Sequence, residues 1–397
     1  MERLKEISNE HIRRIPLVFT RFLVDKIYWP DNLIGISGAR GSGKTTLILQ
    51  YMKKMLPKKT ESLYISLDDI YFSENHLVYF AENFVKQGGE YLFIDEVHKY
   101  PNWSQELKNI YDNLPDLKVV FTSSSALDIY RGSHDLSRRA MVYHLPGLSF
   151  REFIELKYKI VLPMLKLEQV LNAKRDLYWK ILEKIKPLKY FSEYIQYGYY
   201  PFFIETGVNY RKRLLSITNL VLESDLPAIH HIDFYSVIKM KKMLAVLSRI
   251  VPYTPNIQKL ARQTGTSRDS LLKFLFYLEK AGIVKWLSKD TFGINYLNKP
   301  DKLYLQNTNL MYALTEKPTN KGNLRETFFL SQLSVNHKVT YPEIGDFLID
   351  DKYTFEIGGK NKTTKQIAGT KNAYLVIDDI EYGFDNKIPL WLFGFLY

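Results

Sequence analysis

The sequence predicts an α/β protein whose N-terminal part is a mostly parallel sheet with helices on both faces. Three short apolar stretches have the length of buried strands: residues 33–37, 91–94 and 117–121. Segments with helical spacing separate them, and strand–helix alternation of this kind places strands in parallel. A leading helix, from about Glu10 to Ile27, would pack before the first strand.

A glycine-rich loop follows the first strand. Residues 38–45 read GARGSGKT, which fits GxxxxGK(S/T), and a breaker-free helical stretch follows over 46–52. Strand, glycine loop and helix in this order predict a phosphate-binding loop, in which backbone N–H groups and a helix N-terminus hold a polyphosphate. Lys44 would reach the β- and γ-phosphates, and the Thr45 hydroxyl would ligate Mg²⁺. The expected nucleotide-binding residues are Gly38, Ala39, Arg40, Gly41, Ser42, Gly43, Lys44, Thr45 and Thr46.

Two carboxylates come directly after the second strand. Asp95 would emerge at the carboxyl end of a buried strand, where ligands bind in open α/β sheets, and would hold Mg²⁺ through water opposite Thr45. Glu96 is the type of residue that activates a water for attack on the γ-phosphate. The acidic pair favours ATP over GTP as the substrate, because GTPases usually place the water-orienting group elsewhere.

The third strand ends in hydroxyl side chains at residues 122–125. A hydroxyl here could bond the attacking water or the γ-phosphate, and Thr122 or Ser124 is favoured because alternate residues share a face. A Ser-rich turn that only caps the next helix explains the same residues.

Composition narrows the class of protein. The chain has 397 residues, which suggests two to four domains, and 46% hydrophobic residues, which is typical of globular proteins. There is no cysteine, so no disulfide framework or thiolate metal site is available. No apolar run reaches membrane-spanning length and the N-terminus lacks a signal core, so we expect a cytoplasmic protein without a membrane partner. The net charge of +12 favours a polyanionic partner.

Five segments in order resemble a family of AAA+-related ATPases that is common in bacteria and archaea: GARGSGKTT, YISLDD, YLFIDEVHK, VVFTSSSA and SRRAMVYHLPGLSFREF. The resemblance covers nearly the whole chain and implies a P-loop NTPase core with a C-terminal region of restriction-endonuclease-like descent. It also implies that Arg139, or alternatively Arg138, senses the γ-phosphate or acts as a finger arginine. A surface arginine before a strand is the plainer interpretation.

Four regions are expected. Residues 1–150 form the AAA+-like core, and the helical residues 151–231 look like the lid that follows it. Residues 232–315 show a helix stopped by Gly265, a second helix capped by Ser267 and a strand over 283–287, which predicts a winged helix-turn-helix. Residues that could meet DNA are Arg268, Ser270 and Lys273 on the second helix and Lys285 and Lys289 on the wing.

Residues 316–397 carry the endonuclease resemblance. That fold groups a helix Glu, a strand Asp and a Glu-x-Lys pair around a divalent metal, and Glu326, Asp346 and Glu356 match the three acids. Position 358 is Gly instead of Lys, and Lys360 is the nearest replacement. We therefore expect a degenerate domain that binds or packs but does not cut.

The chain is thus interpreted as an ATPase that binds and hydrolyses ATP with Mg²⁺ through Lys44, Thr45, Asp95 and Glu96. Nucleotide state would be coupled to a C-terminal region that binds nucleic acid or a protein partner. Two alternatives stay open: a nucleotide-switched DNA-binding or interaction protein with negligible hydrolysis, and an ATP-gated nuclease. A homo-oligomer is also compatible, because a finger arginine that acts between subunits requires one.

Overall fold

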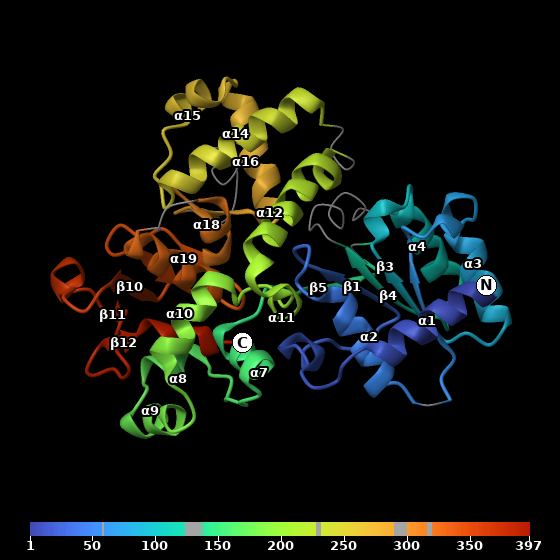
Figure 1. Ribbon diagram of the computed structural model, residues 1–397, viewed down its shortest axis with the longest axis horizontal. Coiled ribbons are helices and arrows are strands. Elements are labelled where there is room, and N and C mark those ends of the chain that lie inside the picture. Colours follow the sequence, from blue (N-terminus) through green and yellow to red (C-terminus); the bar gives the residue numbers. More distant parts are fainter. Residues whose placement is uncertain (58, 124–135, 137, 228–231, 290–299, 316–319) are drawn as a thin grey trace. The chain divides into compact units, whose positions relative to one another are not determined.

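The computed structural model describes residues 1–57, 59–123, 136, 138–227, 232–289, 300–315 and 320–397 (Figure 1). The chain divides into two compact units, Met1–Gly147 and Leu148–Tyr397. Within the described ranges, no helix is both long and apolar enough to cross a membrane.

A five-stranded parallel sheet forms the centre of the first unit, in the order β2-β3-β4-β1-β5 (Figure 1). This confirms the predicted parallel α/β core. The strands are β1 (Leu33–Ser37), β2 (Ser62–Ser66), β3 (Tyr91–Asp95), β4 (Lys118–Ser123) and β5 (Met141–His144).

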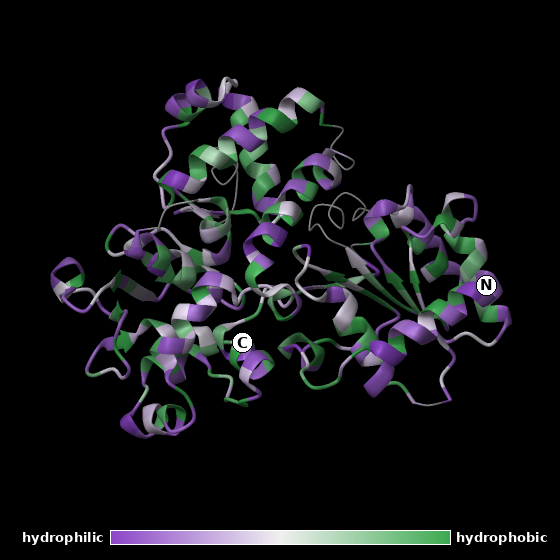
Figure 2. Ribbon diagram, in the orientation of Figure 1, coloured by the Kyte–Doolittle hydropathy of each residue, from purple (hydrophilic) through white to green (hydrophobic). Residues whose placement is uncertain are grey.

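Helices cover both faces of this sheet because its strand residues alternate between two apolar cores. One core contains Ile65, Ile94 and Phe121 with residues of α3 and α4, and the other contains Ile36 and Val120 with residues of α2. Figure 2 shows the strands of this sheet in hydrophobic colours and α1 as largely hydrophilic. The elements around the sheet are α1 (Glu2–Arg14), η1 (Phe22–Asp25), α2 (Lys44–Lys54), η2 (Ile70–Ser73), α3 (Leu77–Lys86), η3 (Val97–Lys99) and α4 (Trp103–Asn113).

The first helix differs from the sequence prediction. It spans Glu2–Arg14 instead of about 10–27, and a short 3-10 turn, η1, follows after an irregular segment. Pro16 explains the early end, because a proline disfavours the helical conformation of the residue before it. Ile15 is accordingly extended, with φ −67° and ψ 127°.

The second unit begins with helices and ends with a mixed sheet. Its helices are α7 (Phe150–Tyr158), α8 (Leu167–Leu171), α9 (Arg175–Leu182), α10 (Pro187–Tyr197), α11 (Phe203–Thr206), α12 (Tyr210–Leu220), α14 (Phe234–Ile250), α15 (Ile257–Thr264), α16 (Arg268–Lys280), α18 (Thr308–Leu314) and α19 (Lys321–Leu333). Strands β6 (Val284–Leu287) and β7 (Lys302–Leu305) pair antiparallel.

The mixed sheet has the order β12-β11-β10-β9-β8. Strands β8 (Val339–Thr340), β9 (Phe347–Ile349) and β10 (Tyr353–Gly358) pair antiparallel, whereas β11 (Ala373–Ile377) and β12 (Lys387–Pro389) continue in parallel. A buried final segment, η7 (Leu390–Phe395), packs against α7 and α19. The four-domain division proposed from the sequence stays a prediction.

One buried asparagine joins several helices of the second unit. The Asn309 side chain at the start of α18 accepts hydrogen bonds from the Tyr199 backbone N–H (2.8 Å) and the Tyr210 hydroxyl (2.5 Å). It donates to the backbone oxygens of Tyr194 (3.1 Å) and Ile195 (3.0 Å) at the end of α10. Its amide oxygen and nitrogen are both well satisfied, so it specifies this junction rather than weakening it.

Candidate nucleotide site

The glycine loop has the geometry its sequence predicts. It connects β1 to α2, and Gly41 (φ 81°) and Gly43 (φ 95°) have left-handed backbones that side-chain-bearing residues rarely adopt. Gly38 is required for a different reason, because a Cβ there would lie 2.4 Å from the Leu145 carbonyl oxygen. The loop is therefore held close to the segment that follows β5.

Lys44 folds back over this loop. Its buried ammonium group donates to the carbonyl oxygens of Gly38 (2.9 Å) and Ala39 (3.2 Å). The Ser42 hydroxyl is fully buried and has no hydrogen-bond partner in the described part of the chain. A cation and an unsatisfied hydroxyl inside one glycine loop are suited to a bound phosphate, which would supply the missing acceptor.

The Asp95 carboxylate at the end of β3 accepts three hydroxyl groups. Thr45 Oγ1 (2.6 Å) and the Tyr64 hydroxyl (2.9 Å) donate to Oδ2, and Thr122 Oγ1 donates to Oδ1. Burial and the neighbouring Asp95 charge raise the pKa of Tyr64 far above its usual value, so this hydroxyl stays a donor. Tyr64 lies on β2, and the sequence analysis did not predict it as a site residue. The only signal for it was a side-chain hydroxyl in the middle of a largely apolar strand.

The next residue, Glu96, has a left-handed backbone (φ 55°), which is uncommon for a residue with a side chain. Its backbone N–H donates to Thr122 Oγ1 (3.2 Å), so one hydroxyl orients both acids. Its Oε2 atom is buried and makes no hydrogen bond within the described residues. His98 Nε2 lies 3.4 Å from this atom, close enough for an ion pair when the histidine is protonated.

The charge environment of Glu96 is mixed. Burial is the main cause that raises the pKa of its carboxyl group, and the Asp95 charge raises it further. The cations Lys44 and Arg40 oppose this shift, so both lie close enough to act on the same carboxylate. A carboxylate with a raised pKa binds a proton more readily, which suits a general base.

The remaining predicted residues of this site are placed differently. Ser124 and Ser137 lie outside the described residues. Arg139 makes a two-pronged ion pair with Asp112 of α4, from Nε to Oδ1 (2.7 Å) and from a terminal nitrogen to Oδ2 (3.0 Å). The hydrogen bond from Arg139 lowers the pKa of Asp112. Arg139 would have to leave this pair to reach a phosphate, whereas Arg138 is exposed.

Sequence reasoning also missed Arg21, which is buried between the loop and the end of the unit. One terminal nitrogen donates to the Ser42 carbonyl (2.7 Å), and the other donates to the carbonyls of Pro146 (2.8 Å) and Gly147 (2.9 Å). No motif includes this position, so the sequence contained no local signal for it.

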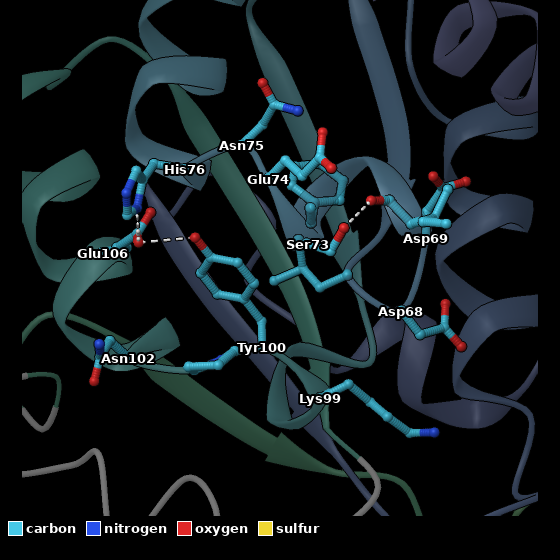
Figure 3. A pocket seen from close by; sticks show the side chains of 14 residues that line it. Asp68, Asp69, Ser73, Glu74, Asn75, His76, Lys99, Tyr100, Asn102 and Glu106 are labelled. Carbon is cyan, nitrogen blue, oxygen red and sulfur yellow. Dashed lines mark hydrogen bonds and ion pairs between the residues drawn. The ribbon is translucent and has the colours of Figure 1, made fainter.

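A cavity of about 630 Å³ is lined by residues 67–76, which follow β2, and by residues 99–106, which follow β3 (Figure 3). Glu106 organises its wall: it accepts from the Tyr100 hydroxyl (2.9 Å) and the Val78 backbone N–H (2.9 Å), and His76 Nδ1 lies 3.2 Å away. Asp68, Asp69 and Glu74 also line it, and Arg3 is paired with Asp69. The Glu106 contacts join α4 to α3, and the Arg3–Asp69 pair joins α1 to the start of η2.

In the second unit, the predicted DNA-contacting residues have different surroundings. Arg268 and Lys273 are exposed on α16, and Lys289 is exposed after β6. The Ser270 hydroxyl accepts a hydrogen bond from Oγ of Ser267, the N-cap residue of α16 (2.9 Å). Lys285 lies half-buried within β6, where burial lowers its pKa, so it is less suited to a phosphate contact than the exposed cations.

The three C-terminal acids lie close together, but each has its own partners. Glu326 accepts from Lys302 Nζ (2.6 Å) and the Tyr304 hydroxyl (2.9 Å), both on β7. Asp346 accepts from the Ile357 backbone N–H (2.8 Å). Burial, followed by the Glu326 charge, raises the pKa of Asp346 to about 6.

Glu356 is buried and pairs with Lys362, whereas the predicted substitute Lys360 is exposed. A Cβ at Gly358 would lie 2.4 Å from the Lys362 side chain, so this side chain occupies the space beside the glycine. Across the part of the chain that the structure describes, no group of three acidic or histidine residues is placed to hold a metal ion. A metal role for Glu326, Asp346 and Glu356 stays a prediction.

Two family models match parts of the chain. One, described as an AAA domain, matches residues 30–154, and the other, described as a domain of unknown function (DUF8612), matches residues 188–321. The first covers the glycine loop, Asp95, Glu96 and all five strands of the parallel sheet. The match, the parallel sheet and the loop geometry together support an AAA-type P-loop fold for the first unit.

Similar proteins extend over more of the chain. Uncharacterized protein MJ1637 of Methanocaldococcus jannaschii is 25% identical over 313 residues, 72% of this chain and 66% of the relative, just under two thirds of its length. Uncharacterized protein MJ1544 of the same organism is 23% identical over 379 residues, 91% of this chain and 80% of the relative. AMPPCP-bound DnaA from Aquifex aeolicus is 15% identical with a TM-score of 0.27, covering 70% of this chain and 88% of DnaA.

Proposed function

We propose that this chain is an ATPase that binds ATP with Mg²⁺ at the glycine loop and hydrolyses it. The hydrogen bond between Thr45 and Asp95 (2.6 Å) is the main support, because it brings the loop and the acidic strand end into one site. Nucleotide would be held by the backbone of residues 38–46 and by Lys44, which would exchange two loop carbonyls for phosphate oxygens.

The same two side chains suit Mg²⁺. A hydroxyl and a carboxylate are hard oxygen ligands of the kind this ion prefers, and it usually keeps several waters and binds phosphates as well. Thr45 would ligate the ion directly and Asp95 through water. The bound ion would neutralise charge that develops on the phosphates.

Hydrolysis is assigned to Glu96. The Oε2 atom, which accepts no hydrogen bond in the described part of the chain, would accept a proton from a water molecule as the water oxygen attacks the γ-phosphorus. The bond between this phosphorus and the β–γ bridging oxygen breaks, which gives ADP and inorganic phosphate. Thr122 would keep Asp95 and Glu96 in their relative positions through its two hydrogen bonds.

Steady-state phosphate release tests this proposal, with and without DNA. Glu96→Gln should retain ATP binding and lose about 10²–10⁴ in kcat, the usual contribution of a positioned base. Lys44→Ala should abolish tight binding of a fluorescent ATP analogue. Wild-type turnover by Glu96→Gln would refute the role of Glu96. Binding without turnover in the wild type would instead support a nucleotide switch with negligible hydrolysis.

A second function, DNA binding by the second unit, has weaker but specific support. The exposed cations Arg268 and Lys273 lie on one helix of a helix–turn–helix that a β-hairpin follows, and the chain carries a net charge of +12. We propose that nucleotide state at the first unit controls this contact. The lysine-paired acids Glu326 on α19 and Glu356 on β10 would then serve structure and not DNA cleavage.

A further inference from the structure

The end of the first unit runs beside the phosphate loop. The Leu145 backbone N–H donates to the Ser37 carbonyl (2.8 Å), directly before the loop, and His144 Nδ1 lies 3.2 Å from Ser37 Oγ. Gly38 approaches the Leu145 carbonyl so closely that no side chain fits between them. Residues 144–147, here called the exit segment, therefore form one wall of the loop, and the chain enters the second unit at Leu148.

Arg21 also connects the phosphate loop to the exit segment. Its buried guanidinium group bonds the Ser42 carbonyl of the loop and the Pro146 and Gly147 carbonyls of the exit segment. The segment before Arg21 is itself anchored, because the Gln50 side chain on α2 donates to the carbonyls of Pro16 and Phe19 (both 2.8 Å). A planar fork with diverging donors can span these carbonyls, whereas a single lysine ammonium cannot reproduce that geometry.

The bond to Ser42 also constrains a donor of the loop. In a planar trans peptide the C=O and the following N–H point in opposite directions. Arg21 holds the Ser42 carbonyl, and so it fixes the Gly43 N–H on the side of the peptide away from Arg21. Gly43 is the N-cap residue of α2, and the unsatisfied N–H groups at a helix N-terminus bind anions.

We propose that Arg21 is a positioning residue that couples phosphate occupancy of the loop to the exit segment. This inference rests on the proposed nucleotide binding. A phosphate that draws the Gly43 N–H toward itself rotates the Ser42 peptide, and the guanidinium passes this change to the carbonyls of Pro146 and Gly147. Nucleotide state thereby reaches the chain at the point where it leaves the first unit.

Hydrogen exchange of the full-length chain tests this coupling, with and without a saturating non-hydrolysable ATP analogue. In the wild type, the analogue should change exchange at the amides of Leu145, Gly147 and Leu148 by at least several-fold. Arg21→Lys should bind a fluorescent ATP analogue about tenfold more weakly and should lose the response at these amides even at saturation. Arg14→Lys, an exposed arginine on α1, is the matched control and should behave as wild type.

The outcomes separate the two proposals. Absence of analogue binding to the wild type would overturn nucleotide binding and the coupling with it. Binding without any change at the exit segment would overturn the coupling alone, whether or not the variant folds. A saturated, folded Arg21→Lys variant that keeps the wild-type exchange response would also overturn it. A general loss of structure would instead lower the melting temperature and raise exchange throughout the sheet.

Discussion

Replacing Thr122 by valine removes one hydroxyl group while the shape of the side chain is kept. Thr122 is fully buried at the end of β4, where its oxygen donates to Asp95 Oδ1 and accepts from the Glu96 backbone N–H. Valine makes neither bond. Asp95 would lose one of its three hydroxyl donors, and the Glu96 N–H would be left without its partner.

The magnitude follows from these two losses. A hydrogen bond to a charged group contributes about 1.5–3 kcal/mol, and a buried donor left unsatisfied costs about 1–3 kcal/mol. The additional buried methyl group returns about 0.8 kcal/mol. We expect a net loss of about 2–5 kcal/mol, which for a unit of 147 residues lowers the melting temperature by about 6–15 °C. Turnover should also fall, by up to about 10²-fold, because Glu96 loses its backbone anchor.

The assay is thermal unfolding of the full chain followed by phosphate release at a temperature at which both proteins are folded. Thr122→Ser keeps the hydroxyl and is the matched control; loss of one methyl group should cost about 1 kcal/mol. If the valine variant melts within about 1 °C of wild type, the Thr122 hydroxyl does not position Asp95 and Glu96. The same conclusion follows if the melting temperature of the serine variant falls as much as that of the valine variant.

Three further predictions concern the second unit. Arg268→Ala with Lys273→Ala should reduce the salt slope of DNA affinity by about two contacts, whereas Lys26→Ala with Lys54→Ala should not; an unchanged slope would exclude α16 as the contact. The folded pKa of Asp346 is about 6, above its ordinary 3.8, so its stabilising contribution is present below about pH 4 and is lost as pH rises through 6. In urea unfolding between pH 4 and 7, the free energy of unfolding of the wild type should therefore fall by about 2–3 kcal/mol relative to that of Asp346→Asn. Parallel pH curves for the two proteins would contradict this. Wild type should not nick plasmid DNA with Mg²⁺ or Mn²⁺; nicking that Lys362→Ala abolishes and Lys360→Ala spares would show an active site built on Lys362.

The parts of the fold that the sequence predicted are those with local signals. The first strand, its loop and α2 follow from contiguous residues, and Asp95 and Glu96 follow from an acidic pair after an apolar strand. In the second unit, α15 and α16 were predicted because Gly265 and Ser267 mark where one helix ends and the next begins. Each of these signals lies within a few residues of the feature that it predicts.

The residues that escaped prediction reach their partners across long stretches of sequence. Tyr64 meets Asp95 from a neighbouring strand, Arg21 bonds carbonyls more than a hundred residues away, and Lys302 on β7 meets Glu326 on α19. Lys362 reaches back to Glu356 because the chain turns after β10. Such contacts depend on the order of the strands in the sheet and on the course of the turns. Neither can be read from local patterns in a single sequence.

The contact of α7 with η7 has a consequence for synthesis on the ribosome. Ser149 Oγ (2.7 Å) and Arg151 Nε (3.0 Å) donate to a backbone oxygen of Tyr397, and the Phe150 ring packs against Phe395. The residues that open the second unit therefore complete their packing only with residues made almost 250 positions later. The first unit has all of its strands within 147 residues and can fold while translation continues. Phe150 and Phe153 can pack against α10 and α11 as soon as those helices are made, but the part of α7 that contacts η7 stays uncovered until the last residues follow.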